Sequence, residues 1–205
     1  RPCSRGCAVH VTYKLIVLTH GRHDDLVERS LTSFLKHVTP APGSVYLHTD
    51  GGDQRSLWKV AAPLLDDLPG DVVVGGPFVS QGFCRATAAC GQEASRVGDH
   101  DHVFWLEGDF VFNRPVDLHE LAAVLDSLPH LAQMALMRQA VNETEKAAGG
   151  LYESRPGQYE SRHYLYLPWY EHSAYLTTNP SLMRRDFMLD HLWPRYESEC
   201  EGRFG

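Results

Sequence analysis

Long hydrophobic runs and clusters of positive charge are both missing from this 205-residue sequence. No apolar stretch approaches the roughly 18 residues that a membrane-spanning helix needs, so no transmembrane segment is predicted. Lys and Arg number 19 against 26 Asp and Glu, which leaves a formal net charge of -7. A broad grip on nucleic acid or on an anionic membrane needs clustered cations, so the composition disfavours this class of function, while a local pocket built on a few arginines stays open.

The usual sequence signatures of phosphate loops and of serine hydrolases are absent as well. The chain contains neither G-x-x-x-x-G-K-[ST] nor G-x-G-x-x-G, and it lacks the G-x-S-x-G turn. No internal repeat or low-complexity tract is present. Any enzymatic function must therefore rest on a different arrangement of polar residues.

Cysteine is scarce and odd in number, which argues against a disulfide framework. The five cysteines are Cys3, Cys7, Cys84, Cys90 and Cys200. The spacing of the first two is a weak metal signal without a second pair. Cys84 and Cys90 fall in a predicted helix, where we expect buried free thiols. No secretory signal peptide is recognisable, so we expect a cytoplasmic protein.

Strand and helix patterns alternate along the first two thirds of the chain. Apolar runs predict five strands, at residues 13–19, 44–49, 71–75, 102–106 and 133–138. Amphipathic spacing and end signals predict four helices, at residues 24–38, 54–65, 82–97 and 117–128. This alternation is typical of an α/β sheet with right-handed crossovers. Ligands bind at the carboxyl ends of such strands, so the turns at 20–22, 50–53 and 107–109 should converge on one site.

Residues 139–171 interrupt this alternation with Gly-Gly, Pro-Gly and five tyrosines. We expect a long loop there, whose aromatic side chains, Trp169 among them, contact an acceptor or form a small satellite core. A strand at 173–176, a turn at Asn179–Pro180 and a short helix at 186–192 should follow. We divide one single domain into an N-terminal extension (1–12), a nucleotide-sugar-binding α/β part (13–138) and an acceptor-side part (139–205).

Two carboxylates stand at the end of the predicted strand in the stretch "VFWLEGDFVF". Glu107 and Asp109 are one glycine apart, directly after the apolar run, where unpaired charge is costly. Hard cations such as Mg²⁺ or Mn²⁺ prefer carboxylate oxygens, often one or two of them together with substrate phosphates. Gly108 lets a phosphate or a backbone segment come close. A solvated turn is the alternative interpretation of such a triplet.

The chain from about Tyr13 to Glu201 resembles the GT-A glycosyltransferases of the family-2-like kind. The segments that carry the resemblance are "YKLIVLTHGRHDDLVERSLTSFLKH", "VYLHTDGGD", "GFCRATAACGQEA", "VFWLEGDFVF" and "HSAYLTTNPSLMRRDF". The fourth of these looks like the DxD strand of that family, with Glu in the first position. The resemblance implies a GT-A-like Rossmann-type sandwich, with a mainly parallel central sheet and helices on both faces.

The resemblance also implies an activity and a set of site residues. The activity would be a hexosyltransferase reaction that depends on Mn²⁺ or Mg²⁺, with a UDP-sugar as first choice of donor and a GDP-sugar as second. The metal ligands would be Glu107, Asp109 and His172, with His191 competing for the third place. The donor would contact Thr19, His20, Arg22, Asp50, Gly82, Arg85 and Glu107. The alternative for Asp50 is an Asx turn with the following glycines. The alternatives for Gly82 and Arg85 are a plain turn and a surface position.

An inverting reaction needs a carboxylate base for the acceptor hydroxyl, and Glu199 and Glu201 are the candidates. The acceptor is undetermined among a polysaccharide, a lipid carrier, a protein and a modified nucleobase. Two other functions compete with the transferase. One is a non-catalytic nucleotide- or sugar-binding domain of the same fold, which Glu107 in place of Asp keeps open. The other is a nucleotidyltransferase, which the single glycine and missing lysine of "LTHGRHDD" disfavour.

Overall fold

The computed structural model describes residues 11–21, 24–96, 100–136, 156–164, 166–173 and 177–189. Its central sheet has six strands in the order β4-β3-β1-β5-β10-β7. Four neighbours run parallel, namely β4 (Val72–Gly75), β3 (Ser44–Asp50), β1 (Tyr13–His20) and β5 (His102–Glu107). The strand β10 (Ser181–Arg184) lies antiparallel between β5 and β7 (Gln133–Ala135). The sheet is therefore mixed but mainly parallel.

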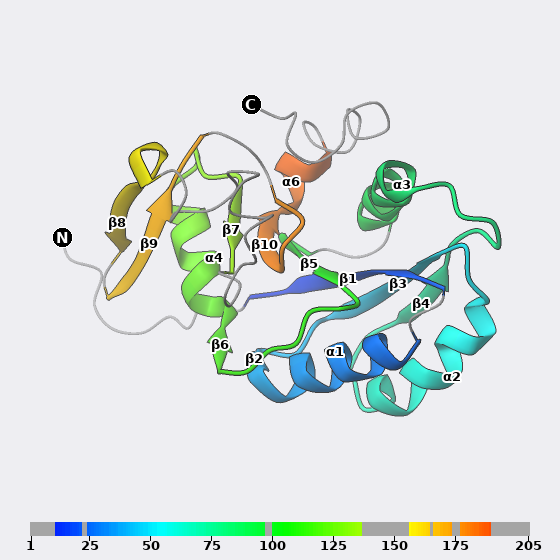
Figure 1. The fold of residues 1–205 in the computed structure, drawn as a ribbon. Helices are drawn as coiled ribbons and strands as arrows, with labels where there is room; N and C mark the ends of the chain where they lie inside the picture. Colours follow the sequence, from blue (N-terminus) through cyan, green and yellow to red (C-terminus); the bar gives the residue numbers. More distant parts are fainter. Residues whose placement is uncertain are drawn as a thin grey trace.

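Helices cover both faces of this sheet (Figure 1). The helices α1 (Asp24–His37), α2 (Gln54–Leu65) and α4 (Leu118–Ser127) pack into one core. The helix α3 (Phe83–Arg96) and residues following the short α6 (Arg185–Phe187) pack into the other. Alternate side chains of β1 explain the two cores, since Leu15 and Val17 enter the first and Ile16 and Leu18 the second. The predicted α/β class, with helices on both faces, is confirmed.

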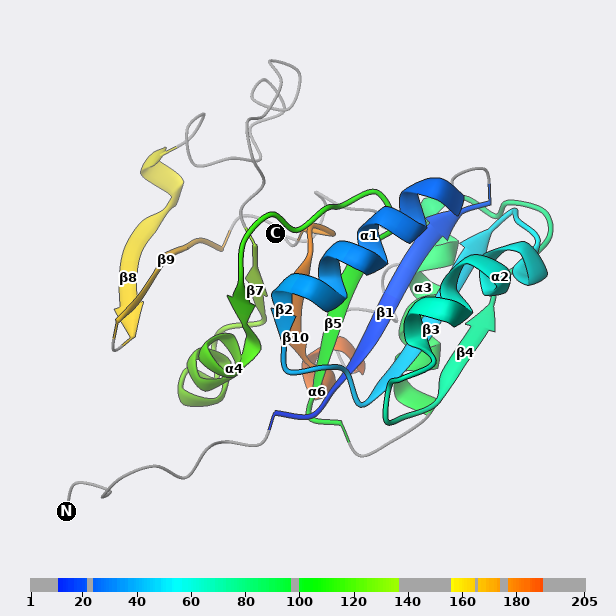
Figure 2. The same ribbon diagram turned by 90° about the horizontal axis from the view of Figure 1, so that it is seen from below.

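The alternating part of the chain matches its prediction to within a few residues at each element end. The structure adds a small parallel pair, β2 (Val38–Thr39) with β6 (Val116–Asp117), that the sequence analysis missed. Seen from below, α1 lies over the sheet and runs roughly along β1, and β4 forms one side of the sheet (Figure 2). The carboxyl ends of β1, β3 and β5 share one edge, which is where a site was expected.

The second half of the chain differs from its prediction. Within the expected loop at 139–171, the described residues form a turn, η1 (Pro156–Gln158), and an antiparallel hairpin of β8 (Glu160–Tyr164) and β9 (Leu167–Glu171). The side chain of Trp169 is partly buried against the main core, so it packs there rather than in a separate satellite core. The strand expected at 173–176 falls mostly outside the described residues, and β10 follows the predicted turn instead.

The prediction of two free thiols on α3 is wrong for one of them. Cys84 is disulfide-bonded, whereas Cys90 is free, buried, and has a pKa raised by that burial. The partner of Cys84 lies outside the described residues. Disulfides persist in oxidising compartments, so this bond weighs against the expected cytoplasmic location. Within the described ranges, no helix combines the length and apolar character needed to cross a membrane.

Candidate functional site

The carboxyl ends of three neighbouring strands enclose a cavity. In the register of the sheet, His20 of β1 stands beside Asp50 of β3, and Leu18 of β1 stands beside Glu107 of β5. The cavity between them has a volume of about 310 Å³. Its lining residues are Leu18, Thr19, His20, Leu26, Asp50, Ser80, Gly82, Phe83, Ala86, Glu107, Gly108 and Asp109. The strand-end residues therefore converge at one edge of the sheet, as the predicted topology requires.

The acid pair lies at the end of β5, where Glu107 is the last residue of the strand and Asp109 follows in a tight turn. The amide of Phe110 donates to the carbonyl oxygen of Glu107 at 3.2 Å, and the amide of Gly108 donates to the carbonyl oxygen of Leu18 at 2.9 Å. Glu107 is half-buried, while Asp109 is exposed at the rim of the cavity. The turn thus holds both carboxylates at the cavity wall while its backbone is fixed to β1.

Gly108 is required by close packing within this turn. A Cβ added there would lie 2.9 Å from Cγ2 of Val27 and 3.1 Å from both Cβ and Oγ1 of Thr19. These distances leave little room for a side chain. A glycine at position 108 therefore lets the acid pair lie directly against the ends of β1 and α1. It would also leave space for a ligand to approach.

Asp50 is held by the loop that leads into α3. Its Oδ1 accepts a hydrogen bond from the amide of Gln81 at 2.7 Å. Its Oδ2 accepts from the hydroxyl of Ser80 at 2.6 Å and from the amide of Gly82 at 3.1 Å. Burial acts to raise the pKa of Asp50, but these hydrogen bonds and nearby His48 outweigh it, so the pKa lies below its usual value. Asp50 is therefore an ionised carboxylate at neutral pH.

The cavity is acidic. Three of its lining residues carry carboxylates, namely Asp50, Glu107 and Asp109. Among the lining residues of the described structure, His20 is the one with a basic side chain. None of the described residues that line it is Lys or Arg. An anionic ligand would meet net repulsion here unless a cation entered with it. The donor set of Glu107 and Asp109 fits Mg²⁺ or Mn²⁺, which commonly take one or two carboxylates and complete their shell with water and phosphate oxygens.

The third metal ligand predicted from the sequence is not assembled among the described residues. No group of three or more His, Cys, Asp or Glu side chains suited to a metal ion occurs in that part of the chain. His172 follows β9, where its ring packs 4.9 Å from that of Tyr159 and burial lowers its pKa. It does not line the cavity. Its role as a ligand stays a prediction, and the competing His191 lies outside the described residues.

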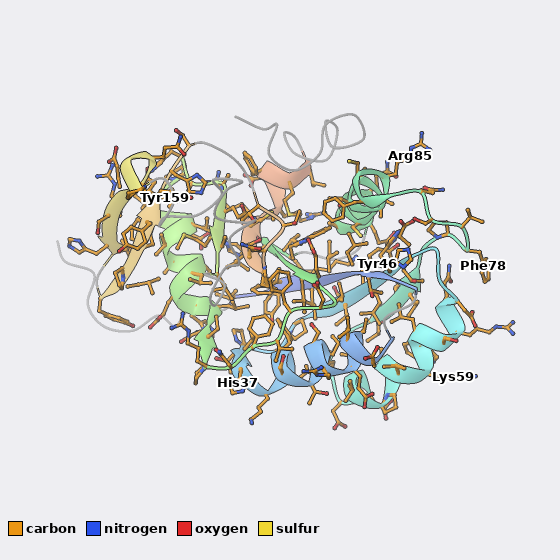
Figure 3. All side chains as sticks on the ribbon, in the orientation of Figure 1. His37, Tyr46, Lys59, Phe78, Arg85 and Tyr159 are labelled. Atoms are coloured by element: carbon orange, nitrogen blue, oxygen red, sulfur yellow. The ribbon has the colours of Figure 1, made fainter. Side chains whose placement is uncertain are left out.

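The predicted donor-binding residues divide into two groups. The structure brings Thr19, His20, Asp50, Gly82 and Glu107 together at the cavity. Arg85 is exposed on α3, does not line the cavity, and points away from the sheet (Figure 3). Arg22, Glu199 and Glu201 lie outside the described residues, so their roles stay predictions.

Sequence reasoning missed Ser80, Phe83 and the apolar wall of Leu18, Leu26 and Ala86. The signal for Ser80 was available, because Ser before Gln-Gly and a helical pattern is typical of a turn that precedes a helix. Its bond to Asp50 spans 30 residues of sequence, which no local pattern reveals.

Comparison with known proteins supports the fold. No protein-family model matches the chain, and no curated protein matches it. Among solved structures, it is similar to a mannosyltransferase from Pyrobaculum calidifontis in complex with GDP-Man and Mn²⁺. The TM-score is 0.56 at 9% identity, over 85% of this chain and 45% of that one.

Two further structures give the same result. TarS 1–349 of S. aureus has a TM-score of 0.55 at 14% identity, over 88% of this chain and 49% of that one. GalNAc-T7 with UDP, GalNAc and Mn²⁺ has a TM-score of 0.51 at 14% identity, over 86% of this chain and 36% of that one. This chain thus spans less than half the length of these relatives. At such identities the likeness shows the fold, which is that of the GT-A glycosyltransferases.

Proposed function

We propose that this protein is a metal-dependent glycosyltransferase that moves a hexose from a nucleotide-sugar to an acceptor hydroxyl. The observation that carries the proposal is the acidic cavity at the carboxyl ends of β1, β3 and β5, with Glu107 and Asp109 at its wall. A nucleoside diphosphate is a strong anion, and it can enter a cavity lined by three carboxylates only together with a cation. Two of the solved structures with a similar fold were determined with a nucleotide or nucleotide-sugar and Mn²⁺.

In this proposal Glu107 and Asp109 hold the divalent ion, and His172 is the candidate for a third ligand. When bound, the ion would neutralise negative charge on the diphosphate leaving group. The residues of the chain would do the rest. The backbone at Thr19 and His20 would line the nucleoside end, and Gly82 would leave room for the ligand beside α3. One of Glu199 and Glu201 would take the proton of the acceptor hydroxyl, which corresponds to an inverting reaction.

A UDP-sugar is the favoured donor, and the hydrogen bonds of Asp50 support this choice. Each carboxylate oxygen can accept about two hydrogen bonds. Oδ2 already accepts two, from Ser80 and Gly82, whereas Oδ1 accepts one, from Gln81. One acceptor position therefore remains. Uracil offers a single N–H on its pairing edge, whereas guanine offers two adjacent donors that suit two open oxygens. A GDP-sugar is thus the second choice.

The test is a panel of nucleotide-sugars scored by slow hydrolysis and by thermal shift, each with and without Mn²⁺. We expect UDP to raise the melting temperature only when Mn²⁺ is present, and one UDP-sugar to be hydrolysed faster than the others. If neither UDP nor GDP binds with Mn²⁺, the proposal is wrong.

A non-catalytic binding domain of the same fold is the second candidate. The feature that keeps it open is Glu107, which stands where the resembling family has Asp. Nucleotide binding with Mn²⁺ but without hydrolysis or transfer, for every sugar and acceptor class offered, would decide for it. The acceptor classes to offer are a polysaccharide, a lipid carrier, a protein and a modified nucleobase.

A further inference from the structure

The sheet ends at β4 in an unprotected edge. In the described structure β4 is hydrogen-bonded to β3 alone, so the backbone groups along its other side have no strand partner there (Figure 2). Natural edge strands are usually protected by a charged side chain, a proline or a bulge. β4 reads Val-Val-Val-Gly and carries none of these in its four residues. Val73 is 39% exposed.

Exposed apolar side chains gather in the same corner of the chain. Among the described residues, large hydrophobic side chains are exposed at Trp58 of α2, which packs on β4, at Val73, and at Phe78 and Val79 of the following loop. Phe78 is 75% and Val79 is 79% exposed, and Phe78 points outward at this end of the molecule (Figure 3). Because Val72 and Val74 pack into the core that α2 covers, Val73 points to the face of the sheet opposite to α2, so exposed apolar side chains flank this edge of the sheet on both faces.

The loop that carries Phe78 and Val79 is held in place by its backbone. The amide of Gly51 donates to the carbonyl oxygen of Pro77 at 3.0 Å, and the Gln54 side chain donates to the carbonyl oxygen of Gly76 at 2.5 Å. Asp50 accepts from the other end of the loop, as described above. The two apolar side chains are therefore presented to solvent by a fixed backbone, which lowers the entropic cost of binding a partner.

The charge pattern indicates what the partner is. The stretch from Val72 to Phe83 contains no charged side chain, although the whole chain carries a net charge of -7. Two copies of a chain with this net charge repel each other over most of their surfaces. The uncharged stretch can contact the same stretch of a second copy without this repulsion. With β4 antiparallel to its copy and Val73 opposite Val73 of that copy, Asp71 falls opposite Gly75 rather than opposite another acid. This self-complementarity is what a two-fold interface requires.

We propose that two copies of this chain associate through antiparallel pairing of their β4 strands, extending the sheet across a two-fold axis and covering Val73 and Phe78. This interface does not depend on the transferase function. The pairing is a β-augmentation in which a second copy supplies the added strand.

Sedimentation velocity over a wide range of protein concentration tests the proposal. We expect a monomer–dimer equilibrium that Val73→Lys weakens at least about tenfold, because two lysines would then face each other across the new strand pair. Val111→Lys is the matched control, since Val111 is 54% exposed outside this corner, and it should leave association unchanged. A native chain that stays monomeric throughout, or a dimer that Val73→Lys leaves intact, overturns the proposal.

Hydrogen exchange on the unmodified chain gives a second measurement that does not depend on a variant folding. The amides of Val72–Gly75 should exchange more slowly in concentrated than in dilute protein, because pairing gives the outward-facing amides a partner. Equal exchange at both concentrations, with a dimer present, would place the interface elsewhere and overturn the proposal.

Discussion

The hydroxyl of Ser80 donates a 2.6 Å hydrogen bond to Oδ2 of Asp50, and so ties the loop before α3 to the end of β3. Asp50 is 5% exposed, so its charge depends on this bond and on those from the amides of Gln81 and Gly82. A carboxylate that accepts three hydrogen bonds in a buried position is costly to disturb. The same carboxylate lines the cavity, so stability and the proposed ligand binding both involve this residue.

Replacing Asp50 should therefore affect folding as well as binding. Asp50→Asn should lower the free energy of unfolding by about 2–3 kcal/mol, because the amide nitrogen would face donors and the charge-assisted bonds would be lost. Ser80→Ala removes one bond of the three and should cost about 1 kcal/mol. Urea denaturation at neutral pH measures both. A larger loss for Ser80→Ala than for Asp50→Asn would contradict this account of the loop.

Gly108→Ala should destabilise the turn that carries the acid pair. The new methyl group would lie 2.9 Å from Cγ2 of Val27 and 3.1 Å from Thr19, so the turn must shift. Overpacking of this kind costs about 1–3 kcal/mol. Because the shift moves Glu107 and Asp109, Mn²⁺-dependent nucleotide binding should weaken too. Combining Gly108→Ala with Val27→Ala makes space and should recover part of both losses, and no recovery would point to a different cause.

The stability of the protein should fall as the pH drops below about 6.5. Burial lowers the pKa of His48 from 6.5, although nearby Asp50 acts to raise it. Nδ1 of His48 is 3.1 Å from the Tyr46 hydroxyl, while Nε2 is buried with no hydrogen-bond partner in the described structure. The unfolded chain therefore binds a proton at a pH where the folded chain does not, and acidification favours unfolding. A second loss should follow below the ordinary Asp value of 3.8, as Asp50 loses its charge.

Urea midpoints at about pH 7.5, 5.5 and 4 measure this dependence. The variant His48→Gln keeps a side chain that can accept a hydrogen bond, but this side chain does not titrate. The midpoint of this variant should change less than that of the parent chain between the first two pH values. Equal changes in the two proteins would show that other groups carry the dependence.

The two cysteines of α3 should behave differently toward alkylating reagents. Cys84 is disulfide-bonded, so it should react only after reduction. Cys90 is buried as a free thiol, and burial raises its pKa, so it should react in the denatured chain and not in the folded one. Peptide mapping without reduction checks both statements. A freely alkylated Cys84 in denatured, unreduced protein would contradict the bond.

The parts of the fold that the sequence predicted are those with strong local signals. The near-continuous apolar runs of β1 and β5 are the pattern of strands buried on both faces. The side chains of Asp53 and Asp117 accept hydrogen bonds from backbone amides in the first turns of α2 and α4, as helix end signals predict. By contrast, β10 is four residues long and takes its place from pairing with β5 and β7. Such pairing is decided by tertiary contacts rather than by the segment itself.

The candidate site divides in the same way. Glu107, Asp109 and Asp50 were predicted because each ends an apolar strand, and parallel strands bring their ends together. The hydrogen bonds of Asp50 and the outward direction of Arg85 could not be predicted. The hydrogen bonds join residues far apart in the sequence, and the direction of the Arg85 side chain depends on how α3 is rotated against the sheet.

The last prediction concerns Asp109, the exposed member of the acid pair. Asp109→Asn is nearly isosteric and should leave the packing unchanged. In the absence of metal it should raise the melting temperature slightly, because two acids separated by one residue repel each other. If Asp109 holds the divalent ion, the variant should also lose the stabilisation that UDP with Mn²⁺ gives the parent chain, since a ligand stabilises only the state that binds it.

Turnover of the preferred nucleotide-sugar should fall together with binding. The loss of rate should correspond to a rise of at least about 3 kcal/mol in the activation free energy. Asp67→Asn is the matched control, because Asp67 is also exposed but does not line the cavity. It should retain Mn²⁺-dependent binding and turnover. Full activity of Asp109→Asn with Mn²⁺ would mean that the metal site lies elsewhere, and the acid pair would then be a solvated turn.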